Sequence, residues 1–352
     1  METRDFRFGI EAELLLVDAR TFRPLWYRDL GFRELLDTLE SIPLDDVSRE
    51  GLRLERPHHF ASPFVVEGYH LPDAEWNPID LLPKGVEIRT PICRSIEGCV
   101  ASLRDLHGRL QRALAARGRT AVSFSFHPYE HTFRGPQNKR RHDFWQWAME
   151  AMLTYGPDIN VGLPGDMFAR LDLDDLQRKV DCYVPALTAL TVATPLYRGE
   201  LWRVRGRVGK SVRTHMRSVV APAIEIHPDQ GGRLELKPFE MPLSFDDFGA
   251  ELLLWLTLLL DERLAGRATP QTRVYDLGEV ARFGLEAEGV RGRVAEVLER
   301  AERVLPEWGF DPAPLAVFAE RLRTGRVPAD DIAEAFEREH SVEQILRGRV
   351  MR

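Results

Sequence analysis

Apolar and polar residues alternate along several short stretches of the chain, with the period of two that places successive side chains on opposite faces of a strand. In residues 6–17, Phe8 and Ile10 fall on one side, while Glu11 and Glu13 fall on the other. Parallel sheets covered on both faces read instead as continuous apolar runs, so the alternation predicts a mostly antiparallel sheet with one polar face. The predicted strands are residues 6–17, 85–90, 121–127, 158–162, 223–227 and 233–237.

Helical periodicity fills much of the sequence between these strands. In residues 95–117, Val100, Leu103, Leu110 and Leu114 recur at the spacing of one helical face. The other predicted helices are residues 31–40, 139–155, 171–192, 246–264 and most of the chain from about residue 276 onward.

The order of these elements predicts an α+β fold, with helices on the outer face of the sheet and an open, polar inner face. We expect a sheet domain over residues 1–270 and a helical C-terminal region, residues 271–352, packed on it. Residues 20–84 are rich in proline and show little periodicity apart from the helix at 31–40. We expect this stretch to form loops on the sheet, and loops of that length are often functional.

Acidic side chains concentrate on the polar face of the predicted strands. Glu11 and Glu13 are two residues apart on one strand, so both carboxylates project from the same surface. Like charges at that spacing repel each other unless a cation lies beside them. A hard divalent ion with oxygen ligands would neutralise the pair, and Mg²⁺ also binds phosphate oxygens. The further carboxylates expected on this face are Glu87, Glu225 and Glu235.

A cation follows three of these acids two residues later. The pairs are Glu87 with Arg89, Glu225 with His227, and Glu235 with Lys237. Glutamate is depleted in strands generally, so its frequency here favours a combined metal and anion site. An ion-pair lattice on a solvated sheet face is the alternative that the residues leave open.

Basic residues concentrate in residues 198–217, where Glu200 is the single acid. The glycines at 199, 206 and 209 predict a flexible loop that could close over phosphates. The stretch 209–211 is no P-loop, because the first glycine of that motif would fall at Val204. A solvated basic loop remains the alternative, but an acidic face in the same chain favours a nucleotide site. The residues expected to contact nucleotide are Arg205, Arg207, Lys210 and Ser211.

The composition excludes several classes of protein. The 352 residues carry a formal net charge of −7, which argues against a general nucleic-acid binder. The three cysteines form no CxxC pair, so we expect neither a disulfide framework nor a thiolate zinc site, as is usual in a reducing cytoplasm. The longest apolar run, residues 252–260, is too short to cross a bilayer. We therefore expect a cytoplasmic protein with no membrane partner.

Short motifs along most of the chain resemble glutamate–cysteine ligase family 2, whose members are also called carboxylate–amine ligases. Residues 41–80 lie outside this resemblance. The motifs, in chain order, are FGIEAELLLVD at 8–18, VEIRTP at 86–91, FHP at 126–128, DINVG at 158–162, ATPLYRG at 193–199, SVR at 211–213, RLELKPFE at 233–240 and ARFGLEAE at 281–288.

The resemblance implies a fold similar to glutamine synthetase, in which a curved antiparallel sheet holds ATP and metal on its inner face. It also implies ATP-dependent formation of an acyl phosphate, followed by attack of an amine to give an amide and ADP. Small-molecule carboxylate and amine substrates, ATP and Mg²⁺ (or Mn²⁺) would then be the ligands. The metal ligands implied are Glu11, Glu13, Glu87 and Glu235. Arg89 would hold the carboxylate substrate, while Arg213 and Lys237 would act on the nucleotide or the transferring phosphoryl group.

The chain departs from this family at two places. Relatives carry a His-x-His pair where this sequence has Asp158 and Asn160; Asp158 suits a hard metal, whereas Asn160 has no acid–base chemistry. Lys237 stands where relatives usually carry arginine, and it offers a point charge in place of a planar fork. The residues expected to contact substrate are His127, Asn160, Glu225 and His227.

Two other functions fit the same sequence features. A phosphotransferase on this fold, resembling guanidino kinases, would give a phosphorylated guanidine and no amide. A binding protein that senses a nucleotide or amino acid without turnover would fit the departures at Asp158, Asn160 and Lys237. The family resemblance also makes a homo-oligomer an expectation.

Overall fold

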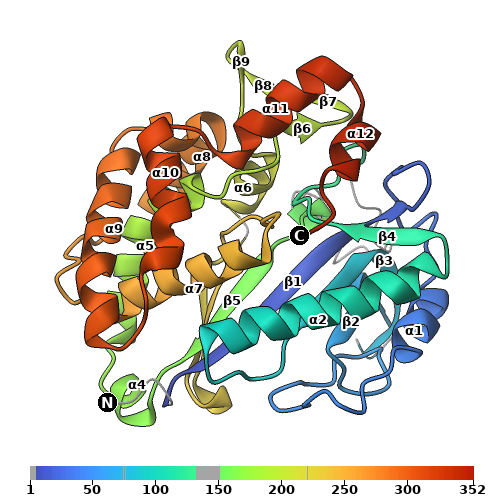
Figure 1. Ribbon diagram of the computed structural model, residues 1–352, viewed down its shortest axis with the longest axis horizontal. Helices are drawn as coiled ribbons and strands as arrows, with labels where there is room; N and C mark the ends of the chain where they lie inside the picture. The colour runs from blue at the N-terminus through green and yellow to red at the C-terminus, as the bar shows by residue number, and fades with distance from the viewer. Residues whose placement is uncertain (1–4, 74, 76, 132–150, 220) are drawn as a thin grey trace.

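An antiparallel sheet of seven strands forms the centre of the described part of the molecule (Figure 1). The computed structural model describes residues 5–73, 75, 77–131, 151–219 and 221–352. The strands follow the order β10-β11-β5-β1-β3-β2, and β4 pairs with β1 beyond the end of β5. Their bounds are β1 Arg7–Asp18, β2 Phe64–Pro72, β3 Pro78–Arg89, β4 Arg119–Val122, β5 Pro157–Gly162, β10 Ile224–His227 and β11 Arg233–Leu236. The predicted α+β fold with a curved antiparallel sheet is confirmed.

The register of the sheet sets acids beside cations on its inner face. In the β1–β3 pair, Glu11 lies opposite Arg89 and Glu13 lies opposite Glu87. On its other side Glu11 lies opposite Asp158 of β5. Residues directly opposite on antiparallel strands point to the same face, so these side chains must meet. The alternate residues of β1, such as Phe8 and Ile10, are buried in the core.

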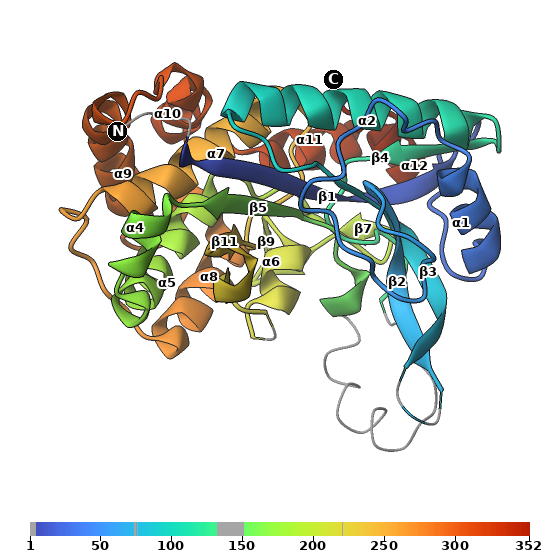
Figure 2. The ribbon, with the colours of Figure 1, turned by 90° about the horizontal axis from the view of Figure 1, so that it is seen from below.

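Helices cover the outer face of the sheet, as Figure 2 shows for α2 and α7. The long apolar run of the sequence forms most of α7, where the indole of Trp255 donates a hydrogen bond to the carbonyl of Leu234 in β11. The Ser95 side chain caps α2 by accepting from the amide of Gly98. The helices of this first part of the chain are α1 Phe32–Glu40, α2 Ile96–Ala115, α4 Gly165–Ala169, α5 Leu173–Ala189, α6 Val212–Arg217 and α7 Phe245–Leu260.

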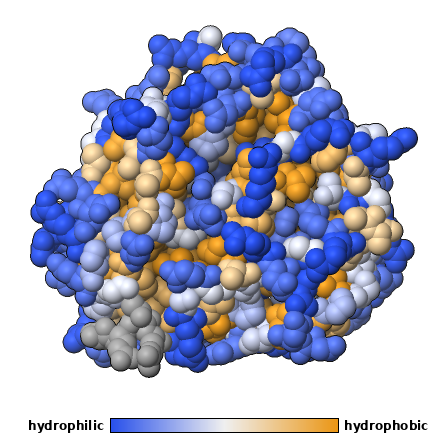
Figure 3. Space-filling view, in the orientation of Figure 1, coloured by the Kyte–Doolittle hydropathy of each residue, from blue (hydrophilic) through white to orange (hydrophobic). Residues whose placement is uncertain are grey.

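The C-terminal helices extend the same core. Val294 and Val297 of α9 belong to one hydrophobic cluster with Ile10 of β1 and Leu103 of α2. Seen from the helical side, hydrophilic residues are interrupted by apolar patches (Figure 3). The hydrophobic core runs through the sheet region and the C-terminal helices. The predicted domain boundary near residue 270 stays a prediction. The remaining helices are α8 Pro270–Phe283, α9 Val290–Glu307, α10 Ala316–Thr324, α11 Pro328–Glu339 and α12 Val342–Arg347, with short 3-10 turns at Ala151–Leu153, Pro228–Gln230, Gly284–Glu286 and Ala313–Leu315.

None of the helices in the described residues is long and apolar enough to cross a membrane.

Two predictions for local structure need correction, and a third falls mostly outside the described residues. Residues 20–84 are not only loops and a helix, because β2 and the first part of β3 form a long hairpin that projects from the sheet (Figure 2). The strand predicted at 121–127 ends with β4 at Val122, and the buried hydroxyls of Ser123 and Ser125 bond the backbone around Met241. The helix predicted at 139–155 lies outside the described residues up to 150, and residues 151–153 form a 3-10 turn.

A buried histidine in α2 predicts sensitivity to acid. His107 packs against Phe245, and burial lowers the pKa of its imidazole to about 4. An unfolded histidine has a pKa near ~6.5, so between pH 6.5 and 4 the unfolded chain binds more protons and the free energy of unfolding falls as the pH drops. When the pH is lowered from 7 to 4.5, the free energy of unfolding should fall by roughly 2 kcal/mol less in His107→Gln than in the parent. Urea denaturation at the two pH values measures this, with the exposed His59→Gln as control; equal losses in parent and His107→Gln would refute it.

Candidate active site

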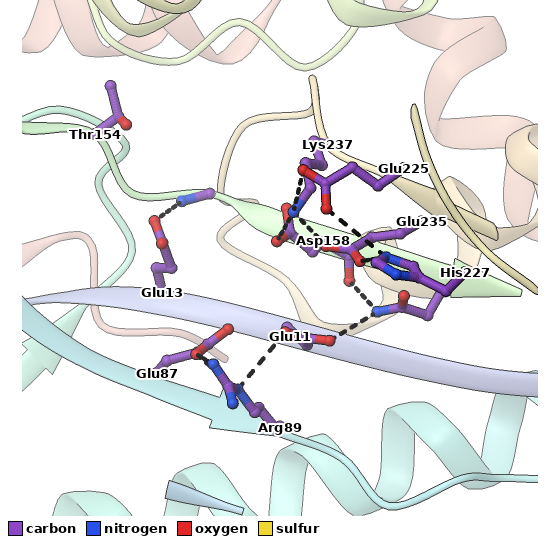
Figure 4. Close-up of polar contacts among 12 residues, drawn as sticks. Glu11, Glu13, Glu87, Arg89, Thr154, Asp158, Glu225, His227, Glu235 and Lys237 are labelled. Carbon is purple, nitrogen blue, oxygen red and sulfur yellow. Dashed lines mark hydrogen bonds and ion pairs between the residues drawn. The ribbon is translucent and has the colours of Figure 1, made fainter. Parts of the chain in front are cut away.

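A cleft of about 920 Å³ opens on the polar face of the sheet. Its floor is formed by β1, β3, β5, β10 and β11, and the loop of residues 51–55 forms one wall. Charged side chains of both signs point into it and toward one another (Figure 4). The acids that line it are Asp5, Glu11, Glu13, Glu55, Glu67, Glu87, Asp158, Glu225 and Glu235, and the basic side chains include Arg89, His227, Arg233 and Lys237.

Three carboxylates from three different strands converge at one end of the cleft. Single oxygens of Glu11, Asp158 and Glu235 lie within 4.8 Å of one another, and Glu235 belongs to a second such group with Glu225 and His227. Oxygen donors at this spacing, with one imidazole beside them, suit a hard divalent ion. The prediction that acids from separate strands meet on one surface is therefore confirmed for these residues, although the metal itself stays a proposal.

Two cations already bridge these carboxylates. Arg233 Nη1 lies 3.1 Å from Glu11 Oε1 and 2.9 Å from Glu235 Oε2. Lys237 Nζ lies 2.8 Å from Asp158 Oδ2 and also contacts Glu235. Asn160 completes the group, because its amide oxygen accepts from Arg233 Nη1 at 2.7 Å. The two cations thus offset part of the charge of the three carboxylates.

The electrostatics of this end show that the acids are crowded. Burial, and then the charge of Glu87, raises the pKa of Glu11 well above its usual value. Burial also raises the pKa of Asp158, although Lys237 opposes the shift. Burial acts in the same direction on Glu235, but its pKa is lowered because Lys237 and Arg233 act against burial. A divalent cation among these oxygens would favour the ionised form of each.

Arg89 organises the opposite wall of the cleft. Its guanidinium contacts Glu87 Oε2 at 2.6 Å and Glu55 Oε2 at 2.6 Å, and it lies 3.6 Å from Glu11 Oε2. Burial raises the pKa of Glu87 to about 8 even with Arg89 beside it. Glu87 therefore belongs to an arginine pair and lies outside the converging group of three carboxylates.

Glu13 is also held by protein donors. Lys84 Nζ lies 3.1 Å from Glu13 Oε1, and the backbone amide of Gly156 donates to Glu13 Oε2 at 3.1 Å. The predicted metal ligands thus divide into two sets. Glu11, Asp158 and Glu235 converge, whereas Glu13 and Glu87 lie outside that group.

The basic segment does not reach the cleft in this structure. Two small hairpins precede α6, formed by β6 Leu196–Tyr197 with β7 Glu200–Leu201 and by β8 Arg203–Val204 with β9 Arg207–Val208. Arg207 is exposed and pairs with Glu286 at 3.5 Å, and Arg205 is exposed in the turn of the second hairpin. Lys210 contacts Asp330 of α11. The hydroxyl of Ser211 is buried, accepts from the amide of Thr214 at the start of α6 and contacts Glu240.

Two further predicted residues lie outside the cleft lining. Arg213 is buried and donates to the backbone carbonyls of Lys237 and Pro238, so it supports the strand end that carries Lys237. Burial lowers the pKa of its guanidinium to about 10. His127 packs on Trp26 with the ring centroids 4.9 Å apart, and its Nδ1 accepts from the amide of Glu130. Burial lowers the pKa of His127 to about 3, so it is a neutral residue of the core.

Several residues in or beside the cleft were not among those predicted from the sequence. Arg233 shares the alternation of Glu235 and Lys237 and could have been included on that ground. Glu55 lies in a loop without periodicity, and its role follows only from the contact with Arg89. Glu67 and Lys84 belong to the β2–β3 hairpin, which proline residues conceal in the sequence.

Comparison with known families identifies relatives of the chain. The sequence profile of glutamate–cysteine ligase family 2 matches residues 7–216. A protein of Jannaschia sp. (strain CCS1) named "Putative glutamate–cysteine ligase 2" is 28% identical over 200 residues, which are 55% of this chain and 43% of that protein. A protein of the same name from Micrococcus luteus is 29% identical over 164 residues, 44% of this chain and 39% of that protein. The matched part of the chain thus spans less than half the length of these relatives.

Two solved structures of other proteins share the fold. A glutamate–cysteine ligase from Francisella tularensis, solved in complex with AMP, superposes with a TM-score of 0.63 at 13% identity, covering 99% of this chain and 88% of that one. A bifunctional glutathione synthetase from Pasteurella multocida gives a TM-score of 0.64 at 16% identity, covering 98% of this chain and 52% of that one. At these identities the likeness establishes the fold.

Proposed function

Because the chain belongs to glutamate–cysteine ligase family 2, we propose that its charged cleft binds ATP with a divalent metal ion and joins a carboxylate to an amine. The observation that carries the proposal is the meeting of Glu11, Asp158 and Glu235 from β1, β5 and β11. Arg233 and Lys237 beside them supply the positive charge that a triphosphate needs. Mg²⁺ or Mn²⁺ held by these oxygens would bind phosphate oxygens and offset their charge.

The reaction would have two steps, a phosphoryl transfer to the carboxylate and an acyl transfer to the amine. A carboxylate oxygen of the first substrate attacks the γ-phosphorus of ATP, and ADP leaves with the electron pair of the broken P–O bond. The nitrogen of the amine then attacks the carbonyl carbon of the acyl phosphate, and inorganic phosphate leaves. Lys237 lies within the cleft at the carboxylate cluster, so its ammonium could stabilise charge on the transferring phosphoryl group.

Arg89 is suited to hold the carboxylate substrate. Its guanidinium is fixed by Glu55 and Glu87, and the fork of such a group can bind a carboxylate with two hydrogen bonds. A substrate carboxylate would compete with Glu55, which comes from a loop, more readily than with Glu87, which is buried on the sheet floor. The two ends of the cleft would then position the carboxylate near the γ-phosphate.

A proton must leave the attacking amine, and Asn160 offers no base for it. His227 is the one imidazole lining the cleft in the described residues, and its Nε2 lies 2.9 Å from Glu235 and 3.7 Å from Glu225. These contacts place His227 and Glu225 at the outer edge of the converging carboxylates. We assign the imidazole of His227 to the amine substrate.

The experiment that tests the function measures all products from the full chain. The purified protein is incubated with Mg-ATP, glutamate as the first carboxylate, and a panel of amino acids and simple amines, and the mixture is analysed by mass spectrometry and a phosphate assay. We expect ADP, phosphate and an amide in equal amounts. A phosphorylated guanidine without amide would instead establish the phosphotransferase, and a raised melting temperature with no ADP release from any mixture would establish a binding protein.

A further inference from the structure

Lys84 lies beside Glu13 and Glu67, two acids of the cleft lining, and is only 5% exposed. Its ammonium is surrounded by acceptors on several sides. Nζ lies 3.1 Å from Glu13 Oε1 and 3.7 Å from Glu67 Oε2, and it donates to the carbonyl of Thr154 at 2.7 Å. It also lies 5.4 Å from the ring centre of the buried Tyr155. A lysine held in this way contributes a fixed positive charge.

The backbone of β3 directs this side chain toward Glu13 and Glu67. In the β2–β3 pair, Glu67 lies opposite Gly85 and Gly68 lies opposite Pro83, which leaves Lys84 without a partner in the register. Strict alternation from Glu87 and Arg89 would turn Lys84 toward the core, on the side of Val86. An extra residue of this kind changes the direction of a strand side chain, which is a common use of a β-bulge.

The residues around the bulge fit this purpose. Gly85 allows β3 to approach β1 closely, because a Cβ atom there would lie 2.2 Å from the carbonyl oxygen of Leu14. Gly68 is equally restricted, since its Cβ would lie 2.0 Å from the carbonyl oxygen of Leu82. Tyr155 donates from its hydroxyl to the carbonyl of Lys84 at 2.8 Å and fixes the backbone of the bulge. The lysine is thus held at both its backbone and its ammonium.

We propose that Lys84 is a positioning residue that serves as a built-in cation between Glu13 and Glu67, in the place that a divalent ion would otherwise take. Divalent ions are thereby confined to the end of the cleft formed by Glu11, Asp158 and Glu235. The inference rests on the proposed function in one respect, namely that this other end binds metal. It explains why Glu13, which shares its strand face with Glu11, has both oxygens engaged by protein donors.

The contrast with Lys237 supports this division of the cleft. The ammonium of Lys237 contacts the carboxylates of Asp158, Glu225 and Glu235. A metal ion could replace this ammonium at those oxygens, and the lysine could turn toward a phosphate. Lys84 instead also donates to the backbone carbonyl of Thr154, and a metal ion at Glu13 would not break that hydrogen bond. Of the two lysines, Lys84 is therefore the one whose ammonium keeps its position when ligands bind.

The test is the number of Mn²⁺ ions bound by the full chain, measured by electron paramagnetic resonance titration with Mn²⁺ alone. We expect Lys84→Met to bind one more Mn²⁺ per chain than the parent, because the oxygens of Glu13 and Glu67 become available. The triple variant Lys84→Met, Glu13→Gln, Glu67→Gln removes those oxygens and should return to the number of the parent. Both variants carry the same apolar side chain at position 84, so the triple variant controls for any change of fold that the loss of the lysine causes.

Equal numbers of bound Mn²⁺ in the parent and in Lys84→Met would overturn the inference, as would an extra ion that persists in the triple variant. If Lys84→Met is poorly soluble, the thermal unfolding of the two variants decides. Mn²⁺ should raise the melting temperature of Lys84→Met more than that of the triple variant, and equal rises would count against the proposal. A parent that binds no Mn²⁺ while Lys84→Met binds one would refute the metal assignment at Glu11, Asp158 and Glu235 and still support the role of Lys84.

Discussion

Glu235→Gln should lower the rate of amide formation by roughly 10²–10³-fold, equivalent to about 3–4 kcal/mol of transition-state stabilisation. Glu235 is the carboxylate that both candidate metal groups share, and it is only 3% exposed. Glutamine keeps the size of the side chain but offers one oxygen and no charge. Lys237 and Arg233 would lose a partner at the same time, so the cleft would become more positive and repel a divalent ion. Steady-state kinetics and Mn²⁺ titration of the same protein measure both effects.

Glu225→Gln is the matched control for this variant. Glu225 lies opposite Glu235 across the β10–β11 pair, but its side chain is 42% exposed and it belongs only to the outer group with His227. The same change of charge there should reduce the rate by no more than about 10-fold, since an exposed carboxylate is better screened. Equal losses in the two variants would show that net charge, and not coordination by Glu235, controls the activity.

Arg89→Met should lower the free energy of unfolding by roughly 3 kcal/mol and abolish amide formation. Arg89 is the main partner of Glu87, which is 3% exposed and whose pKa burial already raises to about 8. Without the guanidinium this carboxylate is buried with no counter-charge and must take up a proton or unfold the site. Urea denaturation at pH 9, above the pKa of Glu87 in the parent, measures the stability, and the product assay measures the activity.

A second substitution separates the structural role of Arg89 from its role in binding. The double variant Glu87→Gln, Arg89→Met removes the unpaired charge, so we expect stability within about 1 kcal/mol of the parent and still no amide. Arg94→Met serves as a surface control, because Arg94 is 62% exposed and lies 4.0 Å from Glu50. Recovery of activity together with stability in the double variant would show that Arg89 does not bind the substrate.

The strands that carry the site were predicted from the sequence with good accuracy. Alternation over residues 6–17 requires Glu11 and Glu13 on the face opposite Phe8 and Ile10, and the structure has them there. The same reasoning placed Glu235 and Lys237 on the polar face of β11. Strand alternation is a local property set by the backbone, so it can be read without knowledge of the partner strands.

The predictions that failed depended on contacts between distant segments. His127 was expected on the open face, but the strand that carries it ends early and its ring packs against Trp26 from a loop about 100 residues away in sequence. The basic segment was expected over the cleft, yet Arg207 and Lys210 pair with Glu286 and Asp330 from the C-terminal helices. A cluster of basic residues in the sequence indicates an anion site. It does not show whether acids from other segments of the folded chain pair with those residues first.

Local patterning was sufficient to establish that acids and cations share one face of an antiparallel sheet, because the period of two and the spacing of each acid–cation pair both lie within a single strand. Which of these acids converge was settled by the folded chain, since the register between strands sets Glu11 beside Asp158 and gives Glu87 to Arg89. The fold also settled the place of Lys84, which an unpaired residue in the β2–β3 register turns from the core toward Glu13. Register depends on long-range pairing, so no pattern within one strand contains it.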